Sequence, residues 1–182
     1  YYTNSAYPTV FSLIRKGLPD AEIGSFCNWS PINKGIVERN ANVTTDTDYD
    51  LELTEKICNY ITEKKPEFLF IQFDGVDHEG HSSGYGSEEY FESIETIDGY
   101  VGEIYNTIKK AGILDSTLLI ITADHGGIGT SHGGASEAEM NTFFGACGKS
   151  INKTGDLEVY GRDIAAIVCY ALDVDGNDKW DS

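Results

Sequence analysis

Two patterns of apolar and polar positions alternate along the chain. Nearly continuous apolar runs, at Glu67–Phe73 (EFLFIQF) and Thr117–Thr122 (TLLIIT), are typical of strands that are covered on both faces in a parallel sheet. A short segment at Ala21–Cys27 predicts another strand, and a further apolar run covers Asn141–Cys147. These runs are the expected strands of the protein.

Amphipathic helices are expected between these runs. The longest begins after Ser87, whose side chain can cap a helix, and keeps apolar residues three and four positions apart until Gly112. A second helix is expected from Leu51 to Lys64, where Pro66 stops it. Two shorter helices are expected at 8–17 and 162–172.

Strands and helices in alternation indicate an α/β fold with a mainly parallel sheet flanked by helices. Residues 30–50 are polar and aperiodic and are expected to form a loop. No repeat or linker divides the chain, which predicts a single domain over residues 1–182. In such folds ligands bind beyond the carboxyl ends of the strands, so the residues that follow 67–73 and 117–122 are the first candidates for a site.

The charge of the chain limits its partners. Thirteen Lys and Arg residues stand against 30 Asp and Glu residues, for a formal charge of −17 among 182 residues. Because binding to a polyanion needs a basic surface, a nucleic acid polymer is not expected as the main partner. Phosphate chemistry on such a chain would need added positive charge, most simply from metal ions.

No segment approaches the roughly 18 apolar residues of a membrane span, and no basic-then-apolar signal opens the chain. The only methionine is Met140, so the sequence does not begin with one. We interpret the sequence as a processed chain or an excised piece of a longer one. The cysteines are far apart and are expected to be buried as small hydrophobic residues. They are Cys27, Cys58, Cys147 and Cys169.

Histidines beside acidic residues are the strongest chemical signal. Asp77 and His81 are four positions apart and can supply an oxygen and a nitrogen to one Zn²⁺-type ion. Asp124 and His125 offer a second such pair after another strand, and His132 follows in a glycine-rich loop. Five ligands exceed one tetrahedral site, so two metals are expected, an arrangement suited to phosphoryl transfer. His78 does not have a fitting spacing and is expected to be a surface or hydrogen-bonding residue, and Asp74 is expected to be a turn residue before Gly75.

Three motifs follow one another in the chain: DHEGH at 77–81, ADHGG at 123–127 and SHGG at 131–134. In this order, separated by a strand and a long helix, they resemble the alkaline phosphatase superfamily. The nearest branch is the type I phosphodiesterase/nucleotide pyrophosphatase group with its ethanolamine-phosphate-transferase-like relatives. The resemblance spans roughly Pro8 to Leu172 and implies an alkaline-phosphatase-like core that lacks its N-terminal strand and helix.

The resemblance also implies a cofactor, two zinc ions in the complete enzyme. One would be held by Asp77, His81 and His132, and the other by Asp124 and His125. A further Asp ligand and the Thr or Ser nucleophile would lie before Tyr1, so no catalytic residue is assigned in this chain. The alternative nucleophile is Thr9, which stands at a helix start. With two of its four ligands, the second site should be weak, and at most about one tightly bound zinc is expected.

The implied function is that of a metal-dependent phosphoric ester hydrolase of the phosphodiesterase, nucleotide pyrophosphatase or phosphatase type. The chain alone would be inactive, because the nucleophile precedes it. The expected partner is a small phosphate-ester substrate, and the resemblance favours an extracytoplasmic location, secreted or periplasmic. The alternative is a non-catalytic metal-binding or interaction module, a pseudoenzyme of the same superfamily.

Overall fold

A small parallel sheet lies at the centre of the protein. The structure, a computed structural model, describes residues 7–149, 151, 155 and 158–180. The sheet has the strand order β2-β1-β3, with β1 at Ile23–Cys27, β2 at Thr44–Asp46 and β3 at Phe68–Gln72. Both pairings are parallel, and the carboxyl ends of β1 and β3 meet, since Cys27 lies opposite Gln72. The predicted strands at 21–27 and 67–73 are therefore confirmed.

The segment 30–50 is not simply a loop, as the sequence led us to expect. It contains a π-helical turn at Ile32–Ile36, a 3-10 turn at Arg39–Ala41 and strand β2. Strand β2 has polar side chains, so no apolar pattern marks it, and it is recruited by backbone pairing with β1. Asn33 supports it from the side, donating to the carbonyl oxygen of Asp46 at 2.7 Å.

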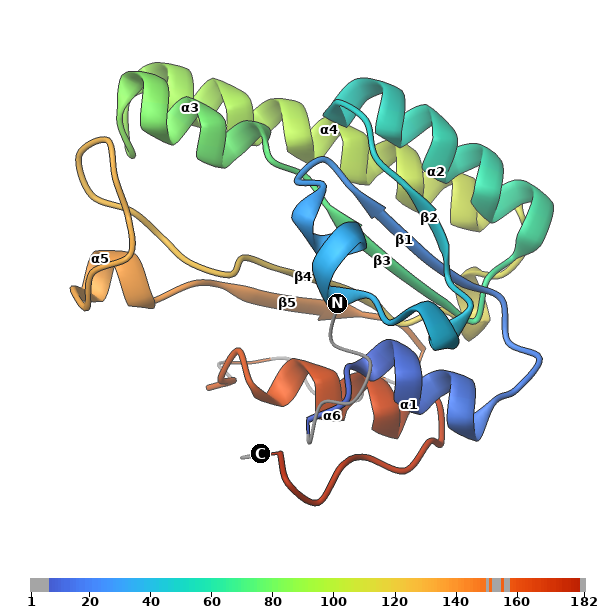
Figure 1. Cartoon of the computed structure of the whole chain (residues 1–182). Coiled ribbons are helices and arrows are strands. Elements are labelled where there is room, and N and C mark those ends of the chain that lie inside the picture. Colours follow the sequence, from blue (N-terminus) through green and yellow to red (C-terminus); the bar gives the residue numbers. More distant parts are fainter. Residues whose placement is uncertain (1–6, 150, 152–154, 156–157, 181–182) are drawn as a thin grey trace.

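Helices cover the parallel sheet on both faces (Figure 1). Helices α2, α3 and α4 lie on one side of it, and α1 and α6 on the other. Their bounds are Val10–Gly17 for α1, Asp50–Lys64 for α2, Gly75–Ser83 for α3, Glu88–Lys110 for α4, Glu137–Met140 for α5 and Asp163–Ala171 for α6. The four helices expected from the sequence correspond to α1, α2, α4 and α6, and Ser87 caps α4 by accepting from the Tyr90 N–H at 3.1 Å.

The core is concentrated around the parallel sheet. On the side of α2 and α4, a cluster of buried residues is formed by Phe26, Leu53, Ile57, Tyr60, Ile61, Ile104 and Ile108. On the side of α1, a second cluster is formed by Phe11, Ile14, Ala21, Ile23 and Ala41. Apolar burial of this kind is the main favourable term in folding. The parallel sheet and its helices are therefore expected to be the most stable part of the protein, and they support the segments that follow the strands.

The last two strands depart from the predicted mainly parallel sheet. Strand β4 (Leu119–Thr122) pairs antiparallel with β5 (Phe144–Cys147), and the two form a separate sheet. Nor are the apolar runs covered on both faces as expected, since all of β3 is half-buried and Ile121 in β4 is 37% exposed. Within the described residues β3 pairs only with β1 and β4 only with β5, which leaves one edge of each strand without a ladder partner.

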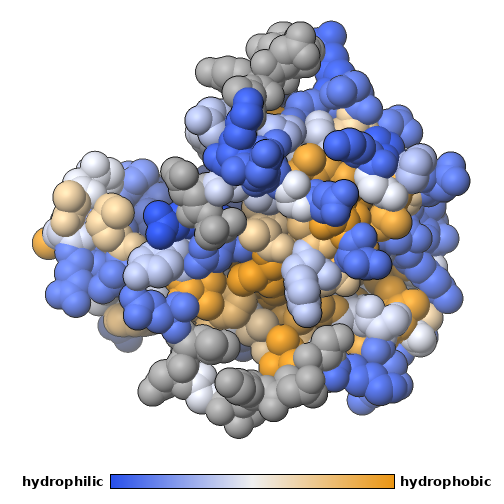
Figure 2. Space-filling view, turned by 90° about the horizontal axis from the view of Figure 1, so that it is seen from below, coloured by the Kyte–Doolittle hydropathy of each residue, from blue (hydrophilic) through white to orange (hydrophobic). Residues whose placement is uncertain are grey.

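Several large apolar side chains are exposed. Figure 2 shows a broad apolar area across the middle of the lower face, bounded by polar residues. Cys27 and Cys169 are buried as expected and Cys58 is half-buried, but Cys147 is exposed because it lies at the end of β5.

Among the described residues, none of the helices combines the length and the apolar character needed to span a bilayer.

Candidate metal centre

Two segments carry the candidate ligands. The first is α3 (residues 75–83), here called the helix arm, which directly follows β3. The second is the stretch 123–136 after β4, here called the loop arm. The sequence predicted one turn or a tight loop at Asp77 and His81, whereas the structure has a helix of nine residues. Residues four apart on a helix share a face, so Asp77 and His81 point the same way.

The helix arm begins on a carboxylate from another helix. Asp50, in the first turn of α2, accepts hydrogen bonds from the backbone N–H groups of Gly75 at 2.8 Å and Asp74 at 3.2 Å. Asn28 donates to the same carboxylate at 2.7 Å. Because the first N–H groups of a helix have no partner within it, a carboxylate at this position stabilises the start of α3.

The loop arm is held by one residue of α5. The carbonyl oxygen of Glu139 accepts from the Gly126 N–H at 2.8 Å, and its carboxylate accepts from the Gly134 N–H at 2.7 Å. Between these points, Ile128 and Ser131 exchange backbone hydrogen bonds of 2.9 and 3.2 Å and turn the chain back. This turn brings His132 close to His125, and their rings stack at a centroid distance of 3.8 Å.

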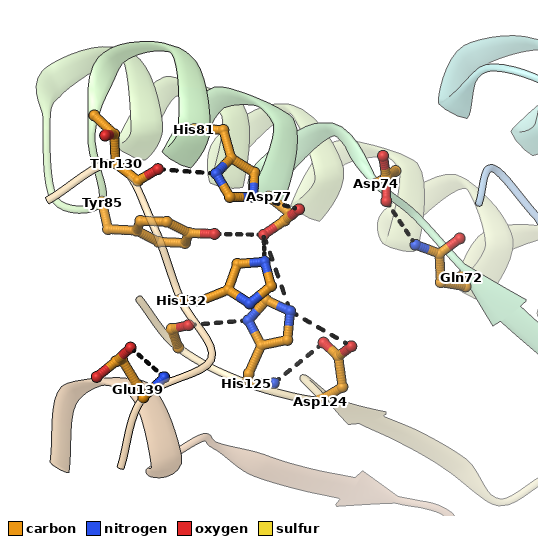
Figure 3. Close-up of polar contacts among 12 residues, drawn as sticks. Gln72, Asp74, Asp77, His81, Tyr85, Asp124, His125, Thr130, His132 and Glu139 are labelled. Carbon is orange, nitrogen blue, oxygen red and sulfur yellow. Dashed lines mark hydrogen bonds and ion pairs between the residues drawn. The ribbon is translucent and has the colours of Figure 1, made fainter. Parts of the chain in front are cut away.

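The two arms meet at Asp77 (Figure 3). The ligating atoms of Asp77, His81 and His132 lie within 4.8 Å of one another. Oδ2 of Asp77 is 3.5 Å from Nε2 of His81, and its Oδ1 is 3.6 Å from Nε2 of His132 and 4.0 Å from Nε2 of His125. Asp124 is the outermost member: its carboxylate is 3.7 Å from Nε2 of His125 and its side chain is 90% exposed.

The hydrogen bonds of the imidazoles fit a cation in this cluster. Nδ1 of His81 lies 2.9 Å from the carbonyl oxygen of Thr130, and Nδ1 of His125 lies 2.9 Å from that of Gly126. A carbonyl oxygen only accepts, so both Nδ1 atoms must donate, and in the neutral rings the Nε2 lone pairs face the carboxylates. A nitrogen lone pair and a carboxylate oxygen repel each other unless a positive charge lies between them. Histidines that bind a metal through one ring nitrogen also commonly donate a hydrogen bond from the other to a carbonyl oxygen.

Three residues around the cluster have shifted pKa values. Burial, followed by the negative charge of Asp77, raises the pKa of Tyr90. Burial, followed by the hydrogen bond that it donates to Asp77, raises the pKa of Tyr85. The hydrogen bond from the Ser136 hydroxyl, followed by that from the Gly134 N–H, lowers the pKa of Glu139. Sequence reasoning missed Asp50, Tyr85 and Glu139. Only Glu139 carries a readable signal, since Ser136 and Glu139 have the spacing of a helix capping box, which α5 forms.

The remaining sequence candidates lie outside the cluster. His78 is exposed on α3, and Asp74 sits at the turn between β3 and α3, as expected. Thr9 donates its hydroxyl to the carboxylate of Glu38. It immediately precedes α1, on the face of the sheet opposite α3 (Figure 1). Among the described residues, Thr9 makes no hydrogen bond to the cluster.

Fold and site together define an α/β protein with an Asp/His cluster of the kind that holds divalent cations at the ends of strands. Residues 6–178 match the family model described as type I phosphodiesterase / nucleotide pyrophosphatase, and the chain belongs to this family. The resemblance noted in the sequence is thereby confirmed.

Several characterised proteins are similar to parts of the chain. GPI ethanolamine phosphate transferase 2 of Aspergillus fumigatus is 27% identical over 119 residues, which are 62% of this chain and 16% of that protein. Ectonucleotide pyrophosphatase/phosphodiesterase family member 7 of Rattus norvegicus is 31% identical over 93 residues, 51% of this chain and 19% of that protein. The chain thus spans less than a fifth of these relatives.

A solved structure is also similar. Murine ectonucleotide pyrophosphatase / phosphodiesterase 5, an inactive variant in complex with AMP, has 20% sequence identity and a TM-score of 0.49. The similarity covers 64% of this chain and 31% of that one.

Proposed function

We propose that this chain forms the cation-binding part of a metal-dependent phosphoric ester hydrolase of the phosphodiesterase, nucleotide pyrophosphatase or phosphatase type. The observation that carries the proposal is the position of Asp77, whose two carboxylate oxygens face imidazole nitrogens from both arms. Family membership supports it, because the family acts on phosphate esters. The substrate we propose is a small phosphate ester.

Zinc is the proposed cation, because two imidazoles and a carboxylate are ligands that it prefers. Asp77, His81 and His132 would hold one ion, while Asp124 and His125 would supply part of a second site. When bound, such ions provide Lewis acidity and positive charge for phosphate oxygens. The chain's own contribution is orientation, since the carbonyl oxygens of Thr130 and Gly126 fix two of the rings.

The attacking group is proposed to come from outside the cluster. Thr9 is engaged with Glu38 on the other face of the sheet, so the structure gives no support to it as the nucleophile. We therefore expect the 182-residue chain to bind zinc but to hydrolyse neither p-nitrophenyl phosphate nor bis-p-nitrophenyl phosphate at a useful rate. Turnover that Thr9→Ala abolishes would contradict this.

Zinc titration of the chain by calorimetry tests the ligand assignment. We expect about one tightly bound zinc per chain, lost in His81→Ala and only weakened in His125→Ala, because Asp124 and His125 form an incomplete site. His78→Ala is the matched control, since His78 is an exposed histidine on the same helix, and it should leave binding unchanged. Two equally tight sites, or zinc binding that does not depend on His81, would show that the assignment is wrong.

A non-catalytic metal-binding module is the rival function, and the zinc titration cannot separate it from an enzyme. The separating experiment assays phosphodiester hydrolysis with zinc on the natural protein that contains these residues. Hydrolysis that His81→Ala removes and His78→Ala retains would support the enzyme. Zinc binding without hydrolysis of mono- or diester substrates would favour the module.

A further inference from the structure

Tyr85 contacts the cluster without being one of the proposed ligands. Its hydroxyl donates a hydrogen bond to Oδ1 of Asp77, and it points into the centre of the site (Figure 3). Its ring stands nearly perpendicular to those of His81 and His132, at centroid distances of 6.0 and 6.4 Å. Tyr85 is half-buried and belongs to the short turn between α3 and α4. No motif in the sequence drew attention to it.

The ring of Tyr85 occupies a slot made by two glycines, one from each arm. A Cβ atom at Gly80 of the helix arm would lie 2.7 Å from the ring, and one at Gly127 of the loop arm would lie 2.5 Å from it. Neither distance is compatible with a side chain, because non-bonded carbon atoms pack at about 3.5–4.0 Å. The ring therefore acts as a spacer between the arms, and only glycine on both sides leaves room for it.

The backbone of Tyr85 also joins the arms. Its N–H donates to the carbonyl oxygen of Gly129 in the loop arm at 2.7 Å. The turn that allows this contact depends on Gly84, whose φ of +106° lies where residues with a side chain are strained. One residue next to the helix arm is thus tied to the loop arm by its backbone, and to Asp77 by its hydroxyl.

We propose that Tyr85 is a positioning residue for the cation site, acting through Asp77 rather than on the cation itself. The inference rests on the proposed function. A carboxylate can rotate about its terminal bond, but the hydroxyl of Tyr85 fixes Oδ1 on the side of His132. Oδ2 is then left facing His81. A group that orients a metal ligand in this way commonly changes metal affinity by about 10–100-fold.

The test compares two tyrosines that are packed together. Tyr85→Phe removes the hydroxyl and keeps the ring, while Tyr90→Phe removes a hydroxyl that makes no hydrogen bond with any described residue. The two rings lie 5.5 Å apart. Zinc affinity of the 182-residue chain is measured by competition with a chromophoric chelator. We expect Tyr85→Phe to bind zinc about tenfold more weakly and Tyr90→Phe to bind it as the unsubstituted chain does.

Two further measurements separate positioning from a general structural role. The urea midpoint of the metal-free chain should fall only slightly with Tyr85→Phe, because the ring still fills its slot and one partly exposed hydrogen bond contributes little to stability. The visible spectrum of the Co²⁺-loaded chain should change in Tyr85→Phe and not in Tyr90→Phe, because Asp77 is held differently.

Each opposite result overturns the inference. Unchanged zinc affinity would show that the hydroxyl does not position Asp77, and tighter binding would show that it competes with the cation for Oδ1. A fall in affinity that is accompanied by a large loss of metal-free stability would mark Tyr85 as a structural residue only. If the unsubstituted chain bound no zinc, or bound it independently of His81, the proposed function would fail, and the role of Tyr85 with it.

Discussion

The two arms of the candidate centre are attached to regions of very different packing. The helix arm follows a parallel sheet whose strand β1 is buried throughout. The loop arm follows β4, which pairs only with β5 among the described residues and is half-buried or exposed. The helix arm is thus a regular helix packed on α4, next to a buried core. The loop arm has no regular structure and is held by single hydrogen bonds, from Gly126 and Gly134 to Glu139 and from the Tyr85 N–H to Gly129.

This difference indicates where the site is able to change shape. Regions with few buried contacts open locally at low free energy, whereas core strands and helices open only with global unfolding. We therefore expect Asp77 and His81 to keep their positions while the loop arm, with His125 and His132, moves to accept a cation. The contacts of Tyr85 with both arms would limit that movement.

The largest expected contrast between the two regions is in thiol reactivity. Cys27 at the end of β1 is 0% exposed, and burial raises the pKa of its thiol, while Cys147 at the end of β5 is exposed. Only the thiolate reacts, so Cys27 is protected by both burial and protonation. Iodoacetamide should label Cys147 at least about a hundredfold faster, since an opening free energy of about 3 kcal/mol alone gives that ratio.

Peptide mass spectrometry of the labelled chain measures both rates in one sample. In urea high enough to unfold the chain, the two rates should converge, which serves as the control. Equal rates without urea would show that the parallel sheet is no better protected than the β4–β5 pair.

Matched truncations of isoleucine compare the two regions energetically. Ile57 in α2 is fully buried against the parallel sheet, whereas Ile121 in β4 is 37% exposed. Ile57→Ala should cost about 2–5 kcal/mol of unfolding free energy, because it removes buried methyl groups and leaves a cavity. Ile121→Ala should cost less than about 1 kcal/mol. Urea titration followed by circular dichroism gives both values, and similar losses would contradict the division into a firm and a loose region.

The elements that the sequence predicted are those with a pattern of their own. Helix α4 has apolar spacing and a capping serine, and β3 has a continuous apolar run, so both are readable without knowledge of their neighbours. Strand β2 is polar and depends on pairing with β1. The antiparallel direction of β5 against β4 likewise depends on how the chain returns after residues 123–143. Such features are decided by tertiary contacts.

The same distinction applies to the candidate centre. The order and spacing of the motifs indicated Asp77, His81, Asp124, His125 and His132, and the structure brings these residues together. Helix α3 was not predicted, because it contains two glycines and lacks apolar periodicity, and its N-terminus is bound by Asp50, 25 positions before Gly75. Tyr85 was missed for a similar reason, since its slot exists only once both arms are in place.

The smallest expected effect concerns Asp50, which contacts the helix arm and, among the described residues, makes no hydrogen bond to the loop arm. Asp50→Ala removes the carboxylate that accepts from the N–H groups of Gly75 and Asp74, and helix-capping losses of this kind cost about 1 kcal/mol. Glu52→Ala is the matched control, because Glu52 also lies in the first turn of α2 but is exposed. A general effect of acidic residues on α2 would therefore appear in both variants, and the effect on α3 only in Asp50→Ala.

Hydrogen exchange distinguishes a local from a global loss in Asp50→Ala. Amides of α3 should exchange faster, because their helix has lost its cap, while those of α2 and β1 should change little. Zinc affinity should fall, because Asp77 lies in the loosened first turn of α3, but by a few-fold at most, since Asp77 keeps its hydrogen bond from Tyr85. If exchange instead rose in the loop arm and not in α3, the helix arm would not be the independently supported half of the site.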